Sequence, residues 1–275
     1  MTAITLTNEP RRAAVNTGAG LVSSSLAVAG RMVRKFARTP QLIVFTTIQS
    51  GLFLLMFRFA FGGAINTSGP LSYVNFMVPG FVASSILWAG MGAAVGVAED
   101  IDHGFVDRLR SLPIPRVSVL IGRALADAVM MIWSLVIAAA LGFVVGFRLT
   151  GSWQSALGAL GLCILFGIAF EWVFITIGLV GGTAQSAQSL GLLVVPLVFL
   201  SSAYVPVESM PVGIRQFAEV QPLTPMVDAV RSLASRPGAV QLAHSTGYYV
   251  GLSLIWTVIV IVVFGVLAFL RFSRR

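Results

Sequence analysis

Charged side chains are scarce in this sequence of 275 residues, since Asp, Glu, Lys and Arg together make up 10% of it. A soluble domain carries about 25% charged residues, so this composition excludes an ordinary soluble protein and is typical of a chain that crosses a membrane several times. Hydrophobic residues make up 57%, and the mean hydropathy is +0.92. The net charge of +8 does not indicate a nucleic-acid binder, because the arginines lie between long apolar runs.

Lysine, cysteine and histidine are nearly absent as well, and each absence excludes a chemistry. The only lysine, Lys35, follows an arginine, so the chain has no Walker A motif and no P-loop ATPase site of its own. The only cysteine, Cys163, lies in an apolar run, which excludes an intramolecular disulfide and favours a packed core thiol. HExxH, GxSxG and zinc-spaced Cys/His clusters are missing, so we expect no catalytic residues, metal or cofactor in this chain.

Long apolar runs are present, and they predict six membrane-spanning helices, because about 20 apolar residues cross the hydrocarbon core of a bilayer. The run from Leu149 to Val207 is too long for one span, and the polar stretch GGTAQSAQS (181–189) divides it into two. The predicted spans are residues 41–63, 73–98, 123–147, 154–180, 189–206 and 248–270. We therefore expect an all-α polytopic membrane protein, with an N-terminal segment over 1–40 and a transmembrane domain over 41–275.

The basic residues predict the orientation of these spans. Six spans place both termini on one side, together with the 98–123 loop, and that side holds thirteen basic residues. The other side holds four: Arg148, Arg215, Arg231 and Arg236. Because Lys and Arg are retained in the cytoplasm, we expect cytoplasmic termini in a bacterial plasma membrane. The first forty residues are too polar and glycine-rich for a signal peptide, so we expect the N-terminus to be retained.

Two segments outside the spans have helical periodicity. Residues 22–38 place four apolar side chains on one stripe and most basic ones elsewhere, which predicts an interfacial helix on anionic lipid headgroups. The segment 207–247 is rich in proline, and VGIRQFAEV (212–220) and MVDAVRSLA (226–234) within it have apolar residues three and four apart. We expect two short helices there, on or in the outer leaflet.

The most charged stretch is AEDIDHGFVDRLRSLPIPR, residues 98–116. On a helix, Asp100, His103 and Asp107 would share a face, but acids near a helix start more often oppose the helix dipole than ligate a metal. An apolar stripe on the other face predicts a short helix over 99–113, ended by two prolines. That stripe packs either on the chain's own membrane domain or in a groove of a cytoplasmic partner, and periodicity does not choose between them.

Two charges, Arg58 and Glu171, lie inside predicted spans and are functional candidates for that reason. Their predicted depths differ by roughly 16 Å at 1.5 Å per residue, too much for a direct pair. We expect Arg58 to extend outward to the membrane surface. For Glu171 three roles are open: a buried protonated side chain, a bond to a neighbouring helix, or a place on a substrate path.

Two motifs carry a resemblance to a known family. FMVPGFVASSILWAGMGAAVGVAEDIDHGFVDRLRSLPIPRVSVLIGRALAD (76–127) resembles the permease subunits of type 2 ABC exporters, specifically the daunorubicin-resistance type. QPLTPMVDAVRSL (221–233) resembles the NPLTP-like turn of that family, with Gln221 in place of the usual Asn. The residues of this second motif are Pro222, Leu223, Thr224, Pro225, Asp228 and Arg231.

The resemblance implies a half-transporter that works as a homodimer, or as a heterodimer with a sister permease. Two separate ATP-binding subunits would bind ATP and Mg²⁺, and would dock on the loop between spans two and three, the coupling helix of the family. In this chain the coupling residues are then Glu99, Asp100, Ile101, Gly104, Phe105, Asp107, Arg108, Leu109, Arg110, Ser111, Leu112, Pro113 and Arg116. The implied function is export of hydrophobic or amphipathic drugs, antibiotics or natural products from a bacterial cell.

Other functions remain as alternatives. The same architecture could export a cell-envelope lipid or glycan. A carrier driven by an ion gradient could use Glu171 as its proton site and would need no ATPase. A membrane enzyme is disfavoured, because no nucleophile, base or metal cluster is present in the sequence.

Overall fold

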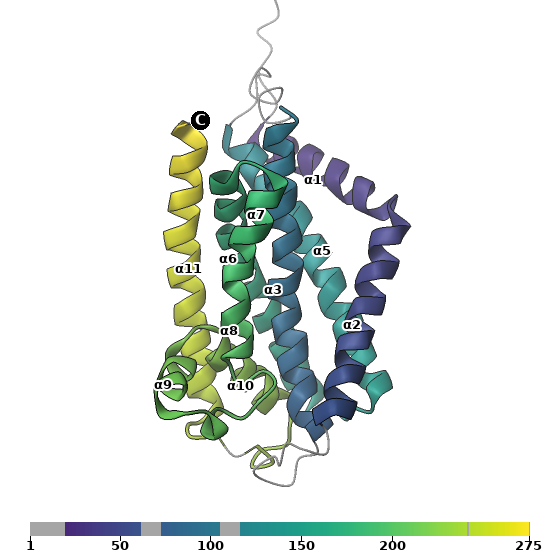
Figure 1. Cartoon of the computed structure of the whole chain (residues 1–275), viewed down its shortest axis with the longest axis vertical. Coiled ribbons are helices and arrows are strands. Elements are labelled where there is room, and N and C mark those ends of the chain that lie inside the picture. Colours follow the sequence, from purple (N-terminus) through teal and green to yellow (C-terminus); the bar gives the residue numbers. More distant parts are fainter. Residues whose placement is uncertain (1–19, 62–72, 105–115, 241, 275) are drawn as a thin grey trace, which may run out of the picture.

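The computed structural model describes residues 20–61, 73–104, 116–240 and 242–274, and all regular structure in them is helical. Five long helices run along the long axis of the molecule (Figure 1). They are α2 (Pro40–Phe61), α3 (Tyr73–Asp102), α5 (Arg116–Val145), α6 (Trp153–Gly181) and α11 (Thr246–Arg274). Each is long and apolar enough to cross a membrane. The all-α, multi-span prediction is therefore confirmed, and these helices correspond to five of the six predicted spans.

The predicted span over 189–206 is not a single helix. Three short helices follow one another instead: α7 (Ala184–Gly191), η1 (Leu192–Val194) and α8 (Val195–Phe199). Together they form an apolar run shorter than the five long helices. The run ends seven residues before the predicted boundary because Ser201 and Ser202, although buried, bond to backbone and side-chain partners in a turn. The prediction treated this turn as continuous helix.

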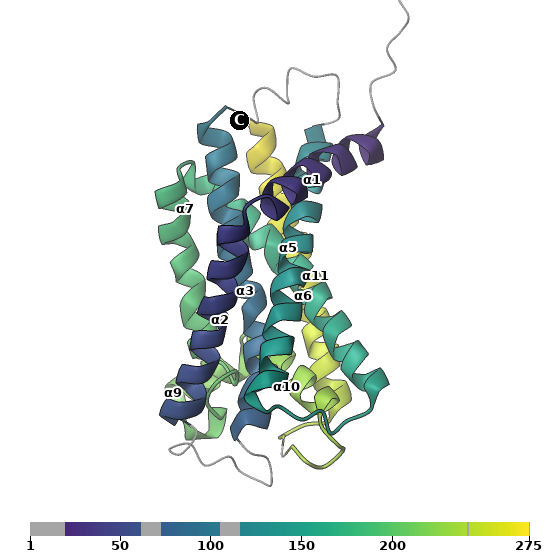
Figure 2. The same cartoon turned by 90° about the vertical axis from the view of Figure 1, so that its right-hand side faces the viewer.

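Helix α1 (Leu21–Ala37) lies across one end of the bundle, which we call the α1 end (Figures 1 and 2). Its buried face is Ser24, Ser25, Val28 and Ala29. This face packs on α5, where a Cβ atom added to Gly122 would lie 2.7 Å from the Ser25 carbonyl oxygen. The predicted apolar stripe lies elsewhere on α1, since Val22 and Leu26 are exposed. The helix is thus present as predicted, and Val22 and Leu26 of its apolar stripe do not pack against the rest of this chain.

The opposite end, the α10 end, carries η2 (Val207–Ser209), α9 (Val212–Val220) and α10 (Leu223–Ala234). Figure 1 shows α9 and α10 together at this end, while α11 finishes at the α1 end. The two short helices predicted between spans five and six are therefore found. They differ in burial: α10 is mostly buried, whereas α9 buries only Ala218.

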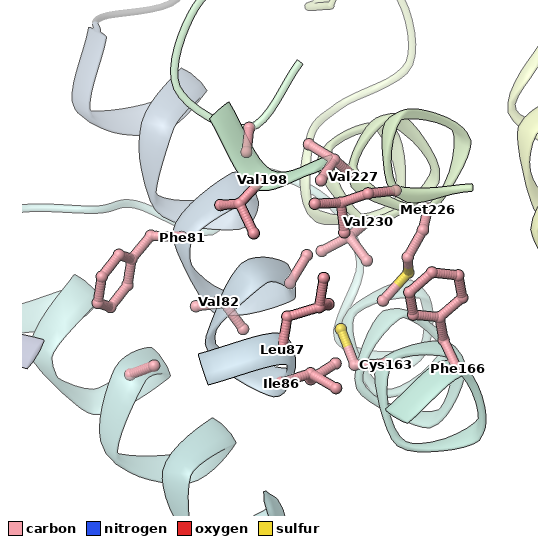
Figure 3. Close-up of a cluster of buried hydrophobic side chains, with 14 of the residues drawn as sticks. Phe81, Val82, Ile86, Leu87, Cys163, Phe166, Val198, Met226, Val227 and Val230 are labelled. Carbon is pink, nitrogen blue, oxygen red and sulfur yellow. The ribbon is translucent and has the colours of Figure 1, made fainter. Parts of the chain in front are cut away.

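The main hydrophobic core is formed where α3, α6, α8 and α10 meet. Figure 3 shows Val82, Ile86 and Leu87 of α3 near Cys163 of α6 and Val227 of α10. Cys163 is fully buried, as expected of a core thiol. A smaller apolar cluster lies at the α1 end, and its buried members are Val97, Val119, Leu120, Ile175, Leu179, Ala268 and Phe272.

Glycines allow the closest approaches between segments. A Cβ atom added to Gly80 of α3 would lie 2.0 Å from the backbone oxygen of Ala203, in the turn after α8. One added to Gly178 of α6 would lie 2.5 Å from the backbone oxygen of Ala94 on α3. Without side chains at these two positions, the backbones of α6 and of the turn pack directly on α3.

Candidate functional site

The predicted coupling segment is described only in part. Glu99, Asp100 and Ile101 form the last turn of α3, so a separate helix does not begin at residue 99. The chain then turns at His103 and Gly104, where Gly104 has a φ of 64°, a conformation that favours glycine. Residue 116 begins α5. The remaining predicted coupling residues, from Phe105 to Pro113, lie outside the described residues.

Arg123 of α5 joins this end of α3 to α5 itself. Its Nη1 donates to Asp100 Oδ2 at 2.8 Å, and its Nε donates to Asp127 Oδ2 at 2.5 Å. Its Nη2 donates to the backbone oxygen of Ala93 at 3.2 Å. The guanidinium occupies the space left by Gly96, because a Cβ atom there would lie 2.4 Å from Nη2. Arg123 therefore ties the last turn of α3, which is the first part of the predicted coupling segment, to the interior of the bundle.

Glu171 of α6 belongs to the same group of charges. Its side chain lies within hydrogen-bonding reach of the Asp127 carboxyl, and both residues are 3% exposed. Among the described residues, the buried side-chain oxygens without a hydrogen-bond partner are Asp127 Oδ1 and Glu171 Oε1.

Arg58, the other predicted intramembrane charge, lies far from this group. Its Nη1 donates to the backbone oxygen of Val145, the last residue of α5. That carbonyl has no partner within its own helix, so Arg58 satisfies one of the free acceptors at the helix end. Arg58 and Glu171 do not pair, and Arg58 extends toward the α10 end.

The second predicted motif, on α10, lies at the opposite end of the bundle. Gln221 Oε1 accepts from the backbone N–H of Leu223, and Gln221 Nε2 donates to Thr224 Oγ1 at 3.0 Å and to the Leu197 backbone oxygen at 3.3 Å. One amide therefore supports the first turn of α10 and binds it to α8. Gln221 stands in place of the usual Asn, and its side-chain amide has the same N–H donors and carbonyl acceptor.

Arg231 and Asp228 form a buried ion pair one turn further along α10. Arg231 Nη1 donates to Asp228 Oδ1 at 2.5 Å, and Ser202 Oγ donates to the same oxygen at 2.8 Å. Arg231 also bonds to the backbone oxygens of Ser202 and Phe76. Burial raises the pKa of Asp228 and lowers that of Arg231, against the opposing attraction between the two charges.

Two cavities flank the α10 motif. The larger, about 600 Å³, has a mixed charged and aromatic lining that includes Arg215, Glu208 and Tyr248. The smaller, about 130 Å³, is apolar and lies between α3, α5 and α6 against Val230 and Ala234 of α10. Drug-sized ligands occupy pockets of about 300–1,000 Å³, so the apolar cavity is too small to enclose one.

The two groups of charged residues differ in what they can do. The α10 group holds the segments of the α10 end together, and none of its atoms is among the described buried side-chain atoms without a partner. The α5 group is incompletely satisfied and adjoins the predicted coupling segment. No group of three or more His, Cys, Asp or Glu side chains able to hold a metal occurs among the described residues.

Sequence reasoning missed the α5 group, because it weighed Glu171 only against Arg58, and the predicted span over 123–147 places Asp127 just four residues after its start. Helix α5 begins at Arg116 and not at residue 123, so Asp127 is eleven residues into it. Glu171 is ten residues from the end of α6. At 1.5 Å per residue both lie roughly 15 Å from the α1 end, and this match in depth was the missing signal.

Comparison with known proteins agrees with this architecture. The family model described as ABC-2 type transporter matches residues 24–234. The chain is 29% identical over 213 residues to the daunorubicin resistance ABC transporter permease protein DrrB1 of Streptomyces coeruleorubidus, covering 77% of this chain and 75% of that one. It is 24% identical over 213 residues to the "Probable doxorubicin resistance ABC transporter permease protein DrrC" of Mycobacterium tuberculosis, covering 78% and 77%.

The matched region runs from α1 to the end of α10 and includes both groups of buried charges. It accounts for more than half of the chain. Together with the long apolar helices, it makes the protein a multi-pass membrane permease and not itself a catalytic enzyme. The chain belongs to the ABC-2 type transporter family.

Proposed function

We propose that this chain is the membrane subunit of an ATP-driven exporter that moves hydrophobic or amphipathic compounds, such as drugs, antibiotics or natural products, out of a bacterial cell. A separate ABC subunit, present twice in the complex, binds Mg²⁺ and ATP and hydrolyses the ATP. The observation that carries the proposal is the similarity, over three quarters of both chains, to a permease named for daunorubicin resistance.

The charge distribution supports an orientation with the α1 end in the cytoplasm. Arg34 and Lys35 of α1 are exposed at this end, where α11 also finishes with Arg271. At the α10 end, Arg231 is buried in an ion pair and Arg215 pairs with Glu219, which leaves Arg148 and Arg236 exposed. Against these two stand Arg34, Lys35 and Arg271 at the α1 end, so the excess of exposed positive charge is there, as expected of a cytoplasmic face.

The same orientation puts the loop after α3 in the cytoplasm, where an ATP-binding subunit can reach it. Residues 99–116 are the docking segment in this proposal. Movement of the loop would be transmitted to the bundle through the Asp100–Arg123 bond at the end of α3. The apolar cavity within one chain is too small for a drug-sized ligand, and the larger cavity has charged side chains such as Glu208 and Arg215 in its lining, so we place the substrate path between two permease chains.

The docking segment can be tested with a double substitution, Arg108→Glu with Leu112→Glu, in the complete complex. We expect loss of co-purification with the ATP-binding subunit and loss of drug-stimulated ATP hydrolysis, since both residues would contact that subunit. Arg236→Glu, an exposed change at the α10 end, is the matched control. An intact complex with normal drug-stimulated hydrolysis in the double variant would refute the docking role.

A further inference from the structure

The contact between Asp127 and Glu171 brings two carboxyl groups from different helices together in the interior of the bundle. Each residue is 3% exposed, and each keeps one oxygen, Asp127 Oδ1 and Glu171 Oε1, without a donor. A buried acceptor without a donor costs free energy, and two adjacent carboxylates at this depth repel each other. A single proton shared by the two groups removes both costs, because it turns one acceptor into a donor to the other.

The surrounding charges also favour an added proton. Arg123 is the basic group that acts on the pair, and it already bonds to Asp127 and to Asp100. With all three acids ionised, the group would have one positive and three negative charges. Helix α11 also packs on α6. The basic residue of α11 whose side chain is described is Arg271, and it is not among the charged groups that interact with Glu171.

A metal ion fits this place poorly. The guanidinium of Arg123 donates to Asp127 Oδ2 and would repel a bound cation. The apolar neighbours of Glu171 along α6, Phe170 and Phe174, are buried and offer no further oxygen ligands. A proton requires no ligands beyond the two carboxyl groups themselves.

We propose that Asp127 and Glu171 form a proton-binding site, with one proton held between the two carboxyl groups and Arg123 linking the site to Asp100. The site goes beyond the proposed export function and does not rest on it. Asp100 is in the last turn of α3, so the charge beside the site depends on the position of that turn. Movement that separates Asp100 from Arg123 changes the charge around the pair, so binding of the proton and position of this turn are coupled in both directions.

The test is infrared spectroscopy of the purified full-length chain in lipid nanodiscs at neutral pH, with no ATP-binding subunit. We compare the chain with its Glu171→Gln variant, whose amide can donate to Asp127 Oδ1 in place of the proton. We expect the difference spectrum to show loss of one protonated carboxyl C=O band that shifts in D₂O. Asp228 is buried on α10 and unchanged in the variant, so any band from it cancels.

Glu219→Gln is the matched control, because Glu219 is an exposed glutamate paired with Arg215, and its removal should take away no protonated band. Carboxyl ¹³C-labelling of glutamate and aspartate in the unaltered chain gives a second measurement. Because Asp228 is labelled as well, the site is supported by a protonated band that moves with the label and is also the band lost in Glu171→Gln. Absence of any protonated carboxyl band in the labelled chain, or an unchanged band in Glu171→Gln, would overturn it.

Discussion

The guanidinium carbon of Arg231 lies 3.8 Å from the centroid of the Phe76 ring. The two residues are 155 positions apart in the chain, and Arg231 Nε also donates to the Phe76 backbone oxygen at 3.1 Å. The same side chain bonds to Asp228 on its own helix and to Ser202 in the turn after α8. Arg231 therefore joins α10, the first turn of α3 and the turn after α8 at one point.

Replacing Arg231 with Ala should strongly destabilise the α10 end. The change removes the cation that pairs with the buried Asp228, and removing one member of a buried ion pair costs about 3–5 kcal/mol. Thermal unfolding of the purified chain in detergent should show a marked fall in the midpoint. Arg236→Ala, an exposed position five residues later, is the control and should leave the midpoint nearly unchanged. Equal midpoints for the two variants would contradict this role for Arg231.

Gly96→Ala and Gly92→Ala should have opposite effects, although the two glycines are one turn apart on α3. A methyl group at Gly96 would lie 2.4 Å from Arg123 Nη2, whereas nothing lies within 4 Å of a methyl group at Gly92. Moving the tethered guanidinium should weaken hydrogen bonds to charged groups worth about 1.5–3 kcal/mol each. Gly92→Ala should be neutral or slightly stabilising, because Ala favours helix by about 1 kcal/mol over Gly. Unfolding midpoints measure both effects, and a lower midpoint for Gly92→Ala than for Gly96→Ala would refute the packing argument.

Gly122→Ala should loosen α1 from the bundle. The added methyl group would lie 2.7 Å from both the Ser25 backbone oxygen and the Val28 Cβ atom, so the two helices must move apart. Trypsin should then cleave faster after the exposed Arg34 and Lys35. Gly161→Ala on α6, where nothing lies within 4 Å of the added methyl group, should be cleaved at the original rate. Equal cleavage rates in the two variants would show that α1 does not depend on this close approach.

Much of the helical architecture could be predicted from sequence, because each long helix contains an apolar run long enough to cross a membrane. The turn at Ser201 and Ser202 could not be predicted, because Ser202 is tolerated in an apolar setting through its bond to Asp228 on α10. That partner lies on another segment, and hydropathy along one segment carries no information about it.

For the charged residues as well, contacts within one helix could be predicted and contacts between helices could not. Asp228 and Arg231 are three residues apart on one helix, so their pairing is local, and the motif already contained both. Asp127 and Glu171 come from different helices, and their contact depends on the depth of each residue and on which helix faces meet. An error of seven residues in the start of α5 was enough to hide it.

The central claim, that this chain exports compounds with energy from a separate ATP-binding subunit, is tested most directly by transport in a reconstituted system. Proteoliposomes would contain this chain with or without its ATP-binding subunit, and uptake of daunorubicin would be followed by fluorescence in inside-out vesicles. The account predicts uptake that requires the ATP-binding subunit and hydrolysable ATP, persists when ion gradients are collapsed, and stops in the Arg108→Glu, Leu112→Glu double variant. Uptake by this chain alone, driven by a proton gradient and lost in Glu171→Gln, would contradict the account and would indicate an ion-driven carrier.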